Sequence, residues 1–464
     1  MKSTQQIPRV VIGGAASNVG KTTVAVALIG ALRARGLRVA AFKCGPDYLD
    51  PTYHARALGG PSHNLDAWMM GRDALVATFA RVAGAADIAV VEGMMGLFDG
   101  TEPQSDEGSS AEIAKWLDAP VLLVVDASGV ARSIAAMTKG YAEFDRALRV
   151  AGVIANRVGG RGHVDLLRAA SGDVAIVGGL PIDAENAFPE RHLGLLAATE
   201  AAVAQKVFAR WSVIAEEWLD LDAILDIARS APELRVADDP GRIAAAVAPR
   251  TRIGIAHDEA FHFYYDDNLR RLESLGAELV RFSPVHDATL PQADGLYIGG
   301  GYPELEVERL SSNVPMIAAI RAFAANGGPV YAECGGLMYL SNAIRTVDGR
   351  AWPMVGLVAG EATMAGWLQA LGYVEVETRA PSILGAAGLR FRGHEFRYSV
   401  LATPGRQTIE RLYSVKPRWG NGEFAEGYSV ANVLASYVHA HWASNPAVAE
   451  GLVESCARWR RSQR

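Results

Sequence analysis

Residues 10–23 read VVIGGAASNVGKTT, and they carry the strongest structural signal in the first half of the chain. A run of β-branched residues leads into a glycine-rich loop, and a helical pattern (VAVALIGALRARG) comes directly after it. This order predicts a phosphate-binding P-loop, because backbone N–H groups and a helix N-terminus attract anionic phosphate. We expect the Lys21 ammonium to reach the β- and γ-phosphates of ATP and the Thr22 hydroxyl to ligate Mg²⁺. The predicted nucleotide-binding residues of the loop are Ser17, Asn18, Val19, Gly20, Lys21, Thr22 and Thr23.

The spacing of this loop departs from the strict P-loop motif by one residue. The strict motif requires glycine at position 15, which is Ala15 here, and Gly14 lies one residue too early. The alternative interpretation is an ordinary strand–turn–helix with a chance GKT tripeptide. The strand and helix patterns on either side of the loop favour the P-loop.

Two acidic segments follow predicted strands, at residues 43–51 (KCGPDYLDP) and 90–100 (VVEGMMGLFDG). Because loops at the carboxyl ends of parallel strands meet in one crevice, we expect both segments to lie beside the Lys21 loop. Carboxylates near a triphosphate are suited to hold Mg²⁺, so Glu92 and Asp47 join Thr22 as candidate metal ligands. Lys43, Asp50 and Asp99 are candidates for substrate binding and activation. The alternative for each Asp is a turn or helix cap.

Short continuous apolar runs alternate with helical patterns along most of the chain, which predicts parallel sheets covered on both faces. The runs of the first half lie at residues 9–12, 38–42, 88–91, 121–125 and 150–155. A second series begins at residues 252–256 and continues at 278–282, 295–298 and 329–332. Turn-forming residues cluster at 231–240 and 247–251, which indicates a linker. We therefore predict two α/β domains, residues 1–245 and 246–464.

The second half contains a candidate nucleophile in residues 329–340 (PVYAECGGLMYL). Cys334 ends a predicted strand and precedes two glycines and a helix, which is the pattern of a nucleophile elbow. A helix N-terminus favours the thiolate, and the N–H of Gly335 is placed to face a developing oxyanion. Gly300, in residues 295–304 (GLYIGGGYPE), is the candidate for the second oxyanion donor. The base candidate in residues 436–442 (SYVHAHW) is His439, with His441 as the competitor on the same side of an extended segment.

The composition limits the classes of function. The chain has 464 residues, with 45 Lys and Arg against 51 Asp and Glu, a net charge of −6 that argues against a dedicated nucleic-acid binder. The three cysteines are widely spaced and form neither a disulfide framework nor a zinc motif, which indicates a reducing compartment. The N-terminus lacks an apolar signal region, and no apolar run is long enough for a membrane span. We expect a cytoplasmic protein.

Several of these motifs resemble known families. The offset P-loop resembles that of dethiobiotin synthetase and its relatives, which phosphorylate a carboxylate. ECGGLMYL, GGGYPE, residues 393–399 (GHEFRYS) and YVHAHW resemble the class I glutamine amidotransferase domain of the corrin amidases. Together with KCGPDYLDP and VEGMMGLFDG, they make nearly the whole chain similar to the cobyrinate/hydrogenobyrinate a,c-diamide synthase family.

This resemblance implies two doubly wound α/β domains, a dethiobiotin-synthetase-like P-loop domain followed by a flavodoxin-like class I amidotransferase domain. It implies that L-glutamine, ATP with Mg²⁺ and a corrin polycarboxylate are the ligands, that the enzyme is a homodimer, and that Asn156 reads the adenine edge. By resemblance His439 is the base and His441 is not. The wider amidotransferase pattern has Glu two residues after the base, where this chain has His441, so the group that orients His439 stays open, with Glu395 as one candidate.

The predicted activity is a carbon–nitrogen ligase that amidates the a and c acetate carboxylates of a corrin ring in cobalamin biosynthesis. Glutamine supplies the ammonia, which crosses between the domains by an enclosed route, and an acyl phosphate activates each carboxylate. Two alternatives remain open. One is a sister amidase, acting on nickel-sirohydrochlorin or on other corrin side chains. The other is a P-loop partner-binding ATPase with an inert amidotransferase-like domain.

Overall fold

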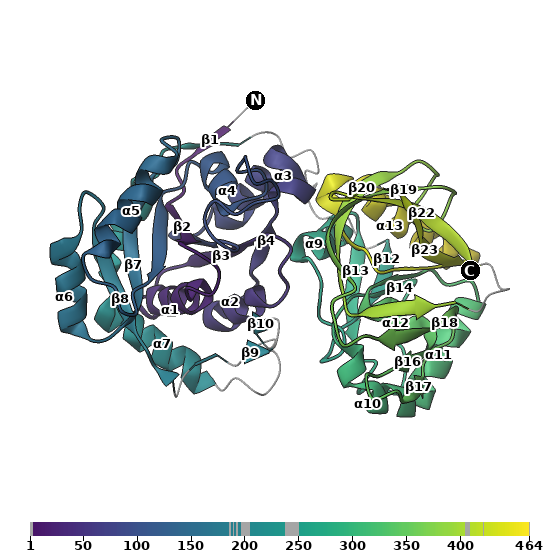
Figure 1. Ribbon diagram of the computed structural model, residues 1–464. Coiled ribbons are helices and arrows are strands. Elements are labelled where there is room, and N and C mark those ends of the chain that lie inside the picture. The colour runs from purple at the N-terminus through teal and green to yellow at the C-terminus, as the bar shows by residue number, and fades with distance from the viewer. Residues whose placement is uncertain are drawn as a thin grey trace. The chain divides into compact units, whose positions relative to one another are not determined.

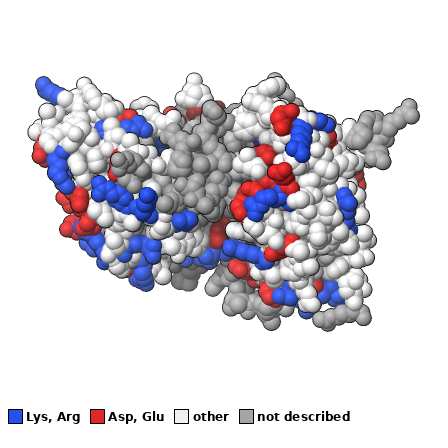
Figure 2. Space-filling model, turned by 90° about the horizontal axis from the view of Figure 1, so that it is seen from below, with Lys and Arg blue, Asp and Glu red and all other residues white. Residues whose placement is uncertain are grey.

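The computed structural model describes residues 3–184, 187–188, 190–191, 194–195, 205–236, 250–403, 409–420 and 422–463. The chain separates into two compact units, Met1–Pro240 and Gly241–Arg464. The predicted boundary near residue 245 lies outside the described residues. Within the described part of the chain, every helix is too short or too polar to cross a bilayer. Basic and acidic side chains are mixed on the face that Figure 2 shows, in keeping with the small net charge of −6.

The first unit is built on a parallel sheet, and its described strands number seven in the order β4-β3-β5-β2-β6-β7-β8. All six pairings in this sheet are parallel. The central strands are buried because helices cover both faces, which is why their sequences are continuously apolar. The strands are β2 (Arg9–Gly14), β3 (Val39–Cys44), β4 (His63–Leu65), β5 (Ile88–Glu92), β6 (Val121–Asp126), β7 (Val150–Val158) and β8 (Ile176–Pro181).

The helices of the first unit form two layers around this sheet. Figure 1 shows α1 and α7 on one side of the sheet and α3 and α4 on the other. The helices are α1 (Lys21–Ala34), α2 (Asp50–Leu58), α3 (Ala67–Ala83), α4 (Ser110–Trp116), α5 (Ser133–Phe144), α6 (Arg161–Ala170), α7 (Gln205–Trp218) and α8 (Leu221–Arg229). Two small antiparallel pairs complete the unit, β1 (Ser3–Gln5) with β11 (Leu234–Val236) and β9 (Glu190–Arg191) with β10 (Gly194–Leu195).

The second unit contains a mixed sheet whose described strands number ten, in the order β13-β12-β14-β15-β24-β23-β22-β19-β20-β25. The part from β13 to β24 is parallel, and the rest is antiparallel. The strands are β12 (Thr251–Ala256), β13 (Ala277–Phe282), β14 (Gly295–Ile298), β15 (Val330–Glu333), β19 (Ala370–Thr378), β20 (Arg390–Arg397), β22 (Glu410–Pro417), β23 (Phe424–Val430), β24 (Val433–Ser436) and β25 (His439–His441).

A smaller sheet and the helices complete the second unit. The described strands of this sheet run in the order β17-β16-β18-β21. They are β16 (Ser341–Arg345), β17 (Ala351–Pro353), β18 (Val358–Met364) and β21 (Ser399–Ala402). The helices are α9 (Asp266–Ser274), α10 (Val307–Ser312), α11 (Val314–Ala325), α12 (Gly335–Leu340) and α13 (Ala447–Ser462), with 3₁₀ turns η2 (Pro303–Leu305) and η3 (Trp442–Ser444).

The structure confirms the predicted α/β class and every apolar run that was expected to form a strand. The antiparallel part of the second unit was not predicted. It differs from the doubly wound pattern because β19, β20, β22 and β23 pair in antiparallel fashion and not through helical crossovers. Their burial alternates or varies along each strand, so they lack the continuous apolar runs on which the prediction relied.

Candidate active sites of the two units

The glycine-rich loop of the first unit connects the carboxyl end of β2 to the start of α1. Gly20 has φ 90°, in the left-handed region that favours glycine. A Cβ at this position would lie 2.0 Å from Nδ2 of Asn156, at the carboxyl-terminal part of β7. The same Nδ2 donates a hydrogen bond to the Val19 carbonyl at 2.8 Å. Asn156 therefore links the loop to β7 by a hydrogen bond. Its predicted contact with adenine stays a prediction.

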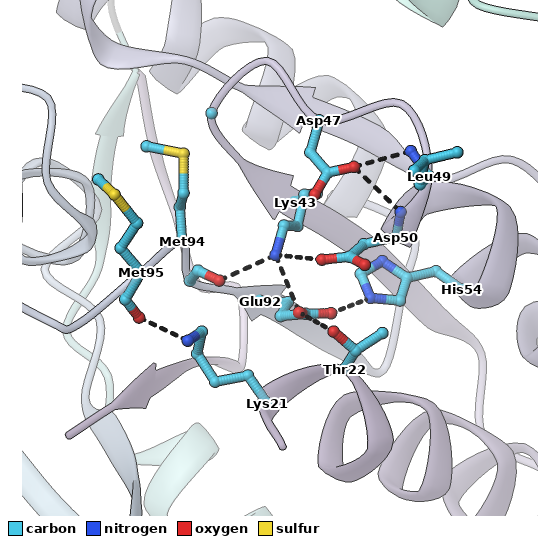
Figure 3. Close-up of polar contacts among 12 residues, drawn as sticks. Lys21, Thr22, Lys43, Asp47, Leu49, Asp50, His54, Glu92, Met94 and Met95 are labelled. Carbon is cyan, nitrogen blue, oxygen red and sulfur yellow. Dashed lines mark hydrogen bonds and ion pairs between the residues drawn. The ribbon is translucent and has the colours of Figure 1, made fainter. Parts of the chain in front are cut away.

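Lys21 lies at the first position of α1 and is buried. Its Nζ donates to the Met95 carbonyl at 2.5 Å (Figure 3). It also donates to the Ala16 carbonyl at 3.3 Å. Burial, together with the positive charge of Lys43, lowers the pKa of Lys21 to about 8. An anionic phosphate bound beside this ammonium would favour its charged form. Ser17 and Asn18 are exposed in the loop, and Thr23 is half-buried in the first turn of the helix.

A buried ionic cluster lies next to Lys21, as Figure 3 shows. Lys43, at the end of β3, contacts Asp50 Oδ2 at 2.6 Å and Glu92 Oε1 at 2.9 Å. The Thr22 hydroxyl donates to the same Glu92 oxygen at 2.8 Å. Burial alone would lower the pKa of Lys43, but the carboxylates of Asp50 and Glu92 outweigh it and raise that pKa well above its ordinary value. The strand ends thus gather Thr22, Lys43, Asp50 and Glu92 at one point.

His54, on α2, belongs to this cluster and was missed by the sequence analysis. Its Nε2 lies 2.5 Å from Glu92 Oε2, and its Nδ1 lies 3.1 Å from the Ser62 hydroxyl. Burial alone would raise the pKa of Glu92, but the Lys43 charge and the His54 hydrogen bond hold it below the ordinary value. A histidine four residues after Asp50, on a helix that starts in the acidic segment, was the available signal.

Asp47 and Asp99 make local hydrogen bonds to the backbone. Asp47 Oδ1 accepts from the N–H groups of Leu49 at 2.7 Å and Asp50 at 3.1 Å, so it caps the start of α2. Asp99 Oδ2 accepts from the Gly96 N–H at 2.9 Å. These contacts agree with the alternative interpretation of each Asp as a turn or helix-cap residue. The predicted roles of Asp47 in metal binding and of Asp99 in activation are not tested by them.

The oxygen donors of the first site fit a Mg²⁺ ion that is bound together with phosphate. Among the described residues, no group of three or more His, Cys, Asp or Glu side chains forms a metal site by itself. Mg²⁺ commonly takes one or two protein oxygens and completes its shell with phosphates and water. The Thr22 hydroxyl and the Glu92 carboxylate at the N-terminus of α1 are such a pair.

The second unit carries Cys334 in a strained turn between β15 and α12. Its backbone has φ 48° and ψ −102°, which is unusual for a residue with a side chain. The following glycines permit this turn, because a Cβ at Gly336 would lie 2.2 Å from the Ile298 carbonyl and one at Gly335 would lie 2.9 Å from Pro303. The Cys334 N–H donates to the Ser436 carbonyl at 2.7 Å. This geometry is that of a nucleophile elbow.

The ionisation of Cys334 differs from the expectation. Burial, reinforced by the charge of Glu304, raises the pKa of the Cys334 thiol to about 12, although the Gly335 N–H acts in the opposite direction. Desolvation therefore opposes the thiolate that a helix N-terminus was expected to favour. Burial also raises the pKa of Cys44 and Cys456 to about 12. The strained elbow, and not the pKa, distinguishes Cys334 from these two.

His439 begins β25 and is buried beside the Gly300 backbone. A Cβ at Gly300 would lie 2.4 Å from Cε1 of His439. The imidazole stacks on His394 of β20, with ring centroids 4.9 Å apart and an interplanar angle of 15°. Burial lowers the pKa of His439 to about 3, so the ring is neutral at physiological pH. The competitor, His441, instead packs against Tyr265 at a centroid distance of 4.6 Å.

The oxyanion candidates are placed as follows. The ideal Cβ position of Gly335 is 3.1 Å from the Gly301 nitrogen, so the Gly301 N–H lies against the elbow. The Gly300 carbonyl accepts hydrogen bonds from the N–H groups of His262 and Phe263, each at 3.0 Å. The predicted oxyanion roles of Gly300 and Gly335 stay predictions. Glu395, the candidate for orienting His439, contacts Arg397 at 3.3 Å.

The two units each match a known family of domains. Residues 10–193 match the CobQ/CobB/MinD/ParA nucleotide binding domain, and residues 252–447 match the CobB/CobQ-like glutamine amidotransferase domain. Together with the P-loop and the cysteine elbow, these matches define a glutamine amidotransferase domain joined to a P-loop nucleotide-binding domain.

Relatives that match over almost the full chain narrow this class. The cobyrinate a,c-diamide synthase of Leptospira interrogans is 52% identical over 453 residues, covering 98% of this chain and 99% of that protein. Those of Syntrophotalea carbinolica and Priestia megaterium are 47% and 40% identical, covering 97% and 98% of this chain and 98% of each relative. The chain belongs to the cobyrinate a,c-diamide synthase family. A solved glutamine amidotransferase aligns with a TM-score of 0.34 at 19% identity, covering 44% of this chain and 98% of that one.

Proposed function

We propose that this protein is an ATP- and glutamine-dependent ligase that amidates the a and c acetate carboxylates of a corrin ring. The observation that carries this proposal is the combination, in one chain, of a cysteine elbow and a neutral buried histidine in one unit with a P-loop beside a buried Lys–carboxylate cluster in the other. One site suits the release of ammonia and the other the activation of an acid. The names and full-length similarity of the relatives support the same activity.

Glutamine hydrolysis begins with a protonated thiol and a neutral imidazole. Cys334 Sγ attacks the side-chain amide carbon of glutamine while His439 takes the thiol proton, and backbone N–H groups at the elbow stabilise the oxyanion. The imidazolium then returns the proton to the leaving nitrogen, so ammonia departs and a thioester remains. Water, deprotonated by His439, attacks the thioester and releases glutamate and the thiol.

The first unit activates the acid. A substrate carboxylate oxygen attacks the γ-phosphorus of ATP, ADP leaves, and an acyl phosphate forms. Ammonia attacks its carbonyl carbon, and phosphate leaves with the C–O electron pair to give the amide. Lys21 stabilises the transferring phosphoryl group. The Lys43 ammonium, which Asp50 and Glu92 hold in place, attracts the substrate carboxylate. Thr22 and Glu92 would hold Mg²⁺, which when bound neutralises phosphate charge; Asp47 is a further candidate ligand.

This scheme requires ammonia to pass from the second unit to the first before water protonates it, as the sequence analysis predicted. We further propose that the enzyme is cytoplasmic and acts as a homodimer. Light scattering coupled to size-exclusion chromatography measures the oligomeric state directly, and a monomer at assay concentrations would contradict the homodimer.

The test is mass spectrometry of the products formed with ATP from three separate substrates: cobyrinate, hydrogenobyrinate and nickel-sirohydrochlorin. The wild-type enzyme should add two amide groups to a corrin with either glutamine or ammonium as the nitrogen source. Cys334→Ser should lose the glutamine-dependent reaction and keep the ammonium-dependent one. Amidation of nickel-sirohydrochlorin alone would favour the sister amidase, and ATP hydrolysis without any amidation would favour the partner-binding ATPase.

A further inference from the structure

Glu333 is a buried carboxylate that the proposed chemistry does not use. It is the last residue of β15 and directly precedes Cys334, with 1% of its surface exposed. A carboxylate is seldom enclosed to this degree unless hydrogen bonds compensate for its lost hydration. Its contacts therefore indicate what it contributes to the site.

Three donors meet the Glu333 carboxylate. The Tyr297 hydroxyl donates to Oε2 at 2.9 Å, and the Tyr331 hydroxyl donates to Oε1 at 2.8 Å. The third donor is the backbone N–H of Ala440, which reaches Oε1 at 3.1 Å. The two tyrosines lie on β14 and β15, within the same parallel sheet as Glu333. Ala440 lies on β25, which is the last strand in the order given for this sheet.

Ala440 is the residue between His439 and His441, and both of its backbone polar groups are held by side chains. Its carbonyl accepts a hydrogen bond from Asn268 Nδ2 at 2.8 Å, and Asn268 Oδ1 accepts from the Trp442 N–H at 2.9 Å. Asn268 lies on α9 and is fully buried. Because adjacent residues share the peptide plane, fixing Ala440 also fixes the direction in which the His439 side chain leaves the backbone.

We propose that Glu333 is a positioning residue of the glutaminase site, which holds the general base His439 in register with the nucleophile through the Ala440 backbone. The inference rests on the proposed function of Cys334 and His439. Glu333 directly precedes Cys334 in the chain. Its carboxylate therefore links the cysteine elbow to β25, the strand that carries the base His439. Where other amidotransferases have an acid two residues after the base, this chain has His441, and its base strand is held from the elbow side instead.

The experiment compares Glu333→Met with Glu333→Gln. Both side chains match glutamate in length, but only Gln retains an oxygen that can accept the Ala440 N–H. Glutamine hydrolysis is measured without ATP or corrin, so a failure of the proposed corrin activity does not affect the result. Because a displaced base costs turnover, we expect Glu333→Met to lower kcat by about tenfold or more with little change in KM, and Glu333→Gln to stay within about threefold of wild type.

Two measurements separate base placement from a damaged fold. Iodoacetamide should alkylate Cys334 more slowly in Glu333→Met than in wild type, because a displaced His439 takes the thiol proton less readily, while the far-UV circular dichroism of the two proteins should be the same. Glu361→Met is the matched control. It replaces a carboxylate that pairs with Arg345 on the small sheet by a side chain of the same length, and this variant should hydrolyse glutamine normally.

A second variant keeps the proposal testable if Glu333→Met does not fold. Asn268→Ala releases the Ala440 carbonyl without touching the elbow, and it should also lower kcat for glutamine hydrolysis. The proposal is overturned if Glu333→Met retains wild-type kcat, if Glu333→Gln loses as much as Glu333→Met, or if Asn268→Ala hydrolyses glutamine at the wild-type rate.

Discussion

Gly300→Ala gives a direct test of the glutaminase geometry, because a single methyl group would be placed against the catalytic imidazole. The ideal Cβ of residue 300 lies 2.4 Å from Cε1 of His439 and 3.3 Å from Cβ of Phe263. Gly300 has no left-handed φ, so alanine causes no backbone strain of its own there. The backbone N–H also remains in alanine, so an oxyanion hydrogen bond donated by residue 300 is retained.

The size of the effect follows from the contact distance. Ordinary van der Waals contact begins near 3.4 Å, so the methyl group and the ring overlap by 1.0 Å, the difference between 3.4 and 2.4 Å. The ring stacks on His394 and is buried. Because a side chain shifts more easily than the backbone of the surrounding sheet, we expect the imidazole to move. A displacement of about 1 Å at a reacting group costs about a hundredfold in rate.

The assay is steady-state glutamine hydrolysis beside ammonium-dependent amidation by the same preparation. We expect kcat for glutamine hydrolysis to fall by about a hundredfold in Gly300→Ala while amidation with ammonium is retained. Gly366→Ala is the matched control, since a Cβ there meets nothing within 4 Å and the residue has no positive φ. Glutamine hydrolysis within about threefold of wild type in Gly300→Ala would refute the contact between residue 300 and the base, and with it the assigned position of His439.

Three further predictions concern the nucleotide site and acid stability. Gly20→Ala should weaken the binding of a fluorescent ATP analogue by about tenfold or more, because its Cβ would meet Asn156 Nδ2 at 2.0 Å and its φ is left-handed; unchanged affinity would contradict the loop geometry. His54→Ala should raise the Mn²⁺ concentration needed to saturate the ATP complex in spin-resonance titrations, whereas His54→Gln, which keeps a donor for Glu92, should titrate closer to wild type; equal titrations in all three proteins would refute this positioning. Burial lowers the pKa of His441 from its ordinary 6.5 to about 4, so the stability it contributes is complete above pH 6.5 and is lost as the pH falls toward 4. Between pH 6.5 and about pH 5 this loss amounts to about 2 kcal/mol of unfolding free energy, which urea titrations should show to be smaller in His441→Asn.

The sequence was sufficient for the α/β class, because a strand buried on both faces must be continuously apolar. The runs that became β2, β5, β6 and β7 carry that signature without help from any distant residue. The P-loop and the cysteine elbow could also be predicted from the sequence, because each is a local strand–turn–helix with glycines at the turn, where a Cβ would meet a neighbouring residue. The antiparallel strands of the second unit were not readable from the same signal, since their burial follows from pairing partners far along the chain.

The tertiary structure alone decided which side chains of different segments meet and in what charge state. His54 joins Glu92 across 38 residues, and Glu333 meets Ala440 across 107 residues. Neither pair of residues has a characteristic separation along the sequence that a motif could describe. Each pairing depends on how helices and strands from separate segments pack. The raised pKa of Cys334 has the same origin: a helix N-terminus is visible in the sequence, but the desolvation that opposes it exists only once the surrounding residues enclose the thiol.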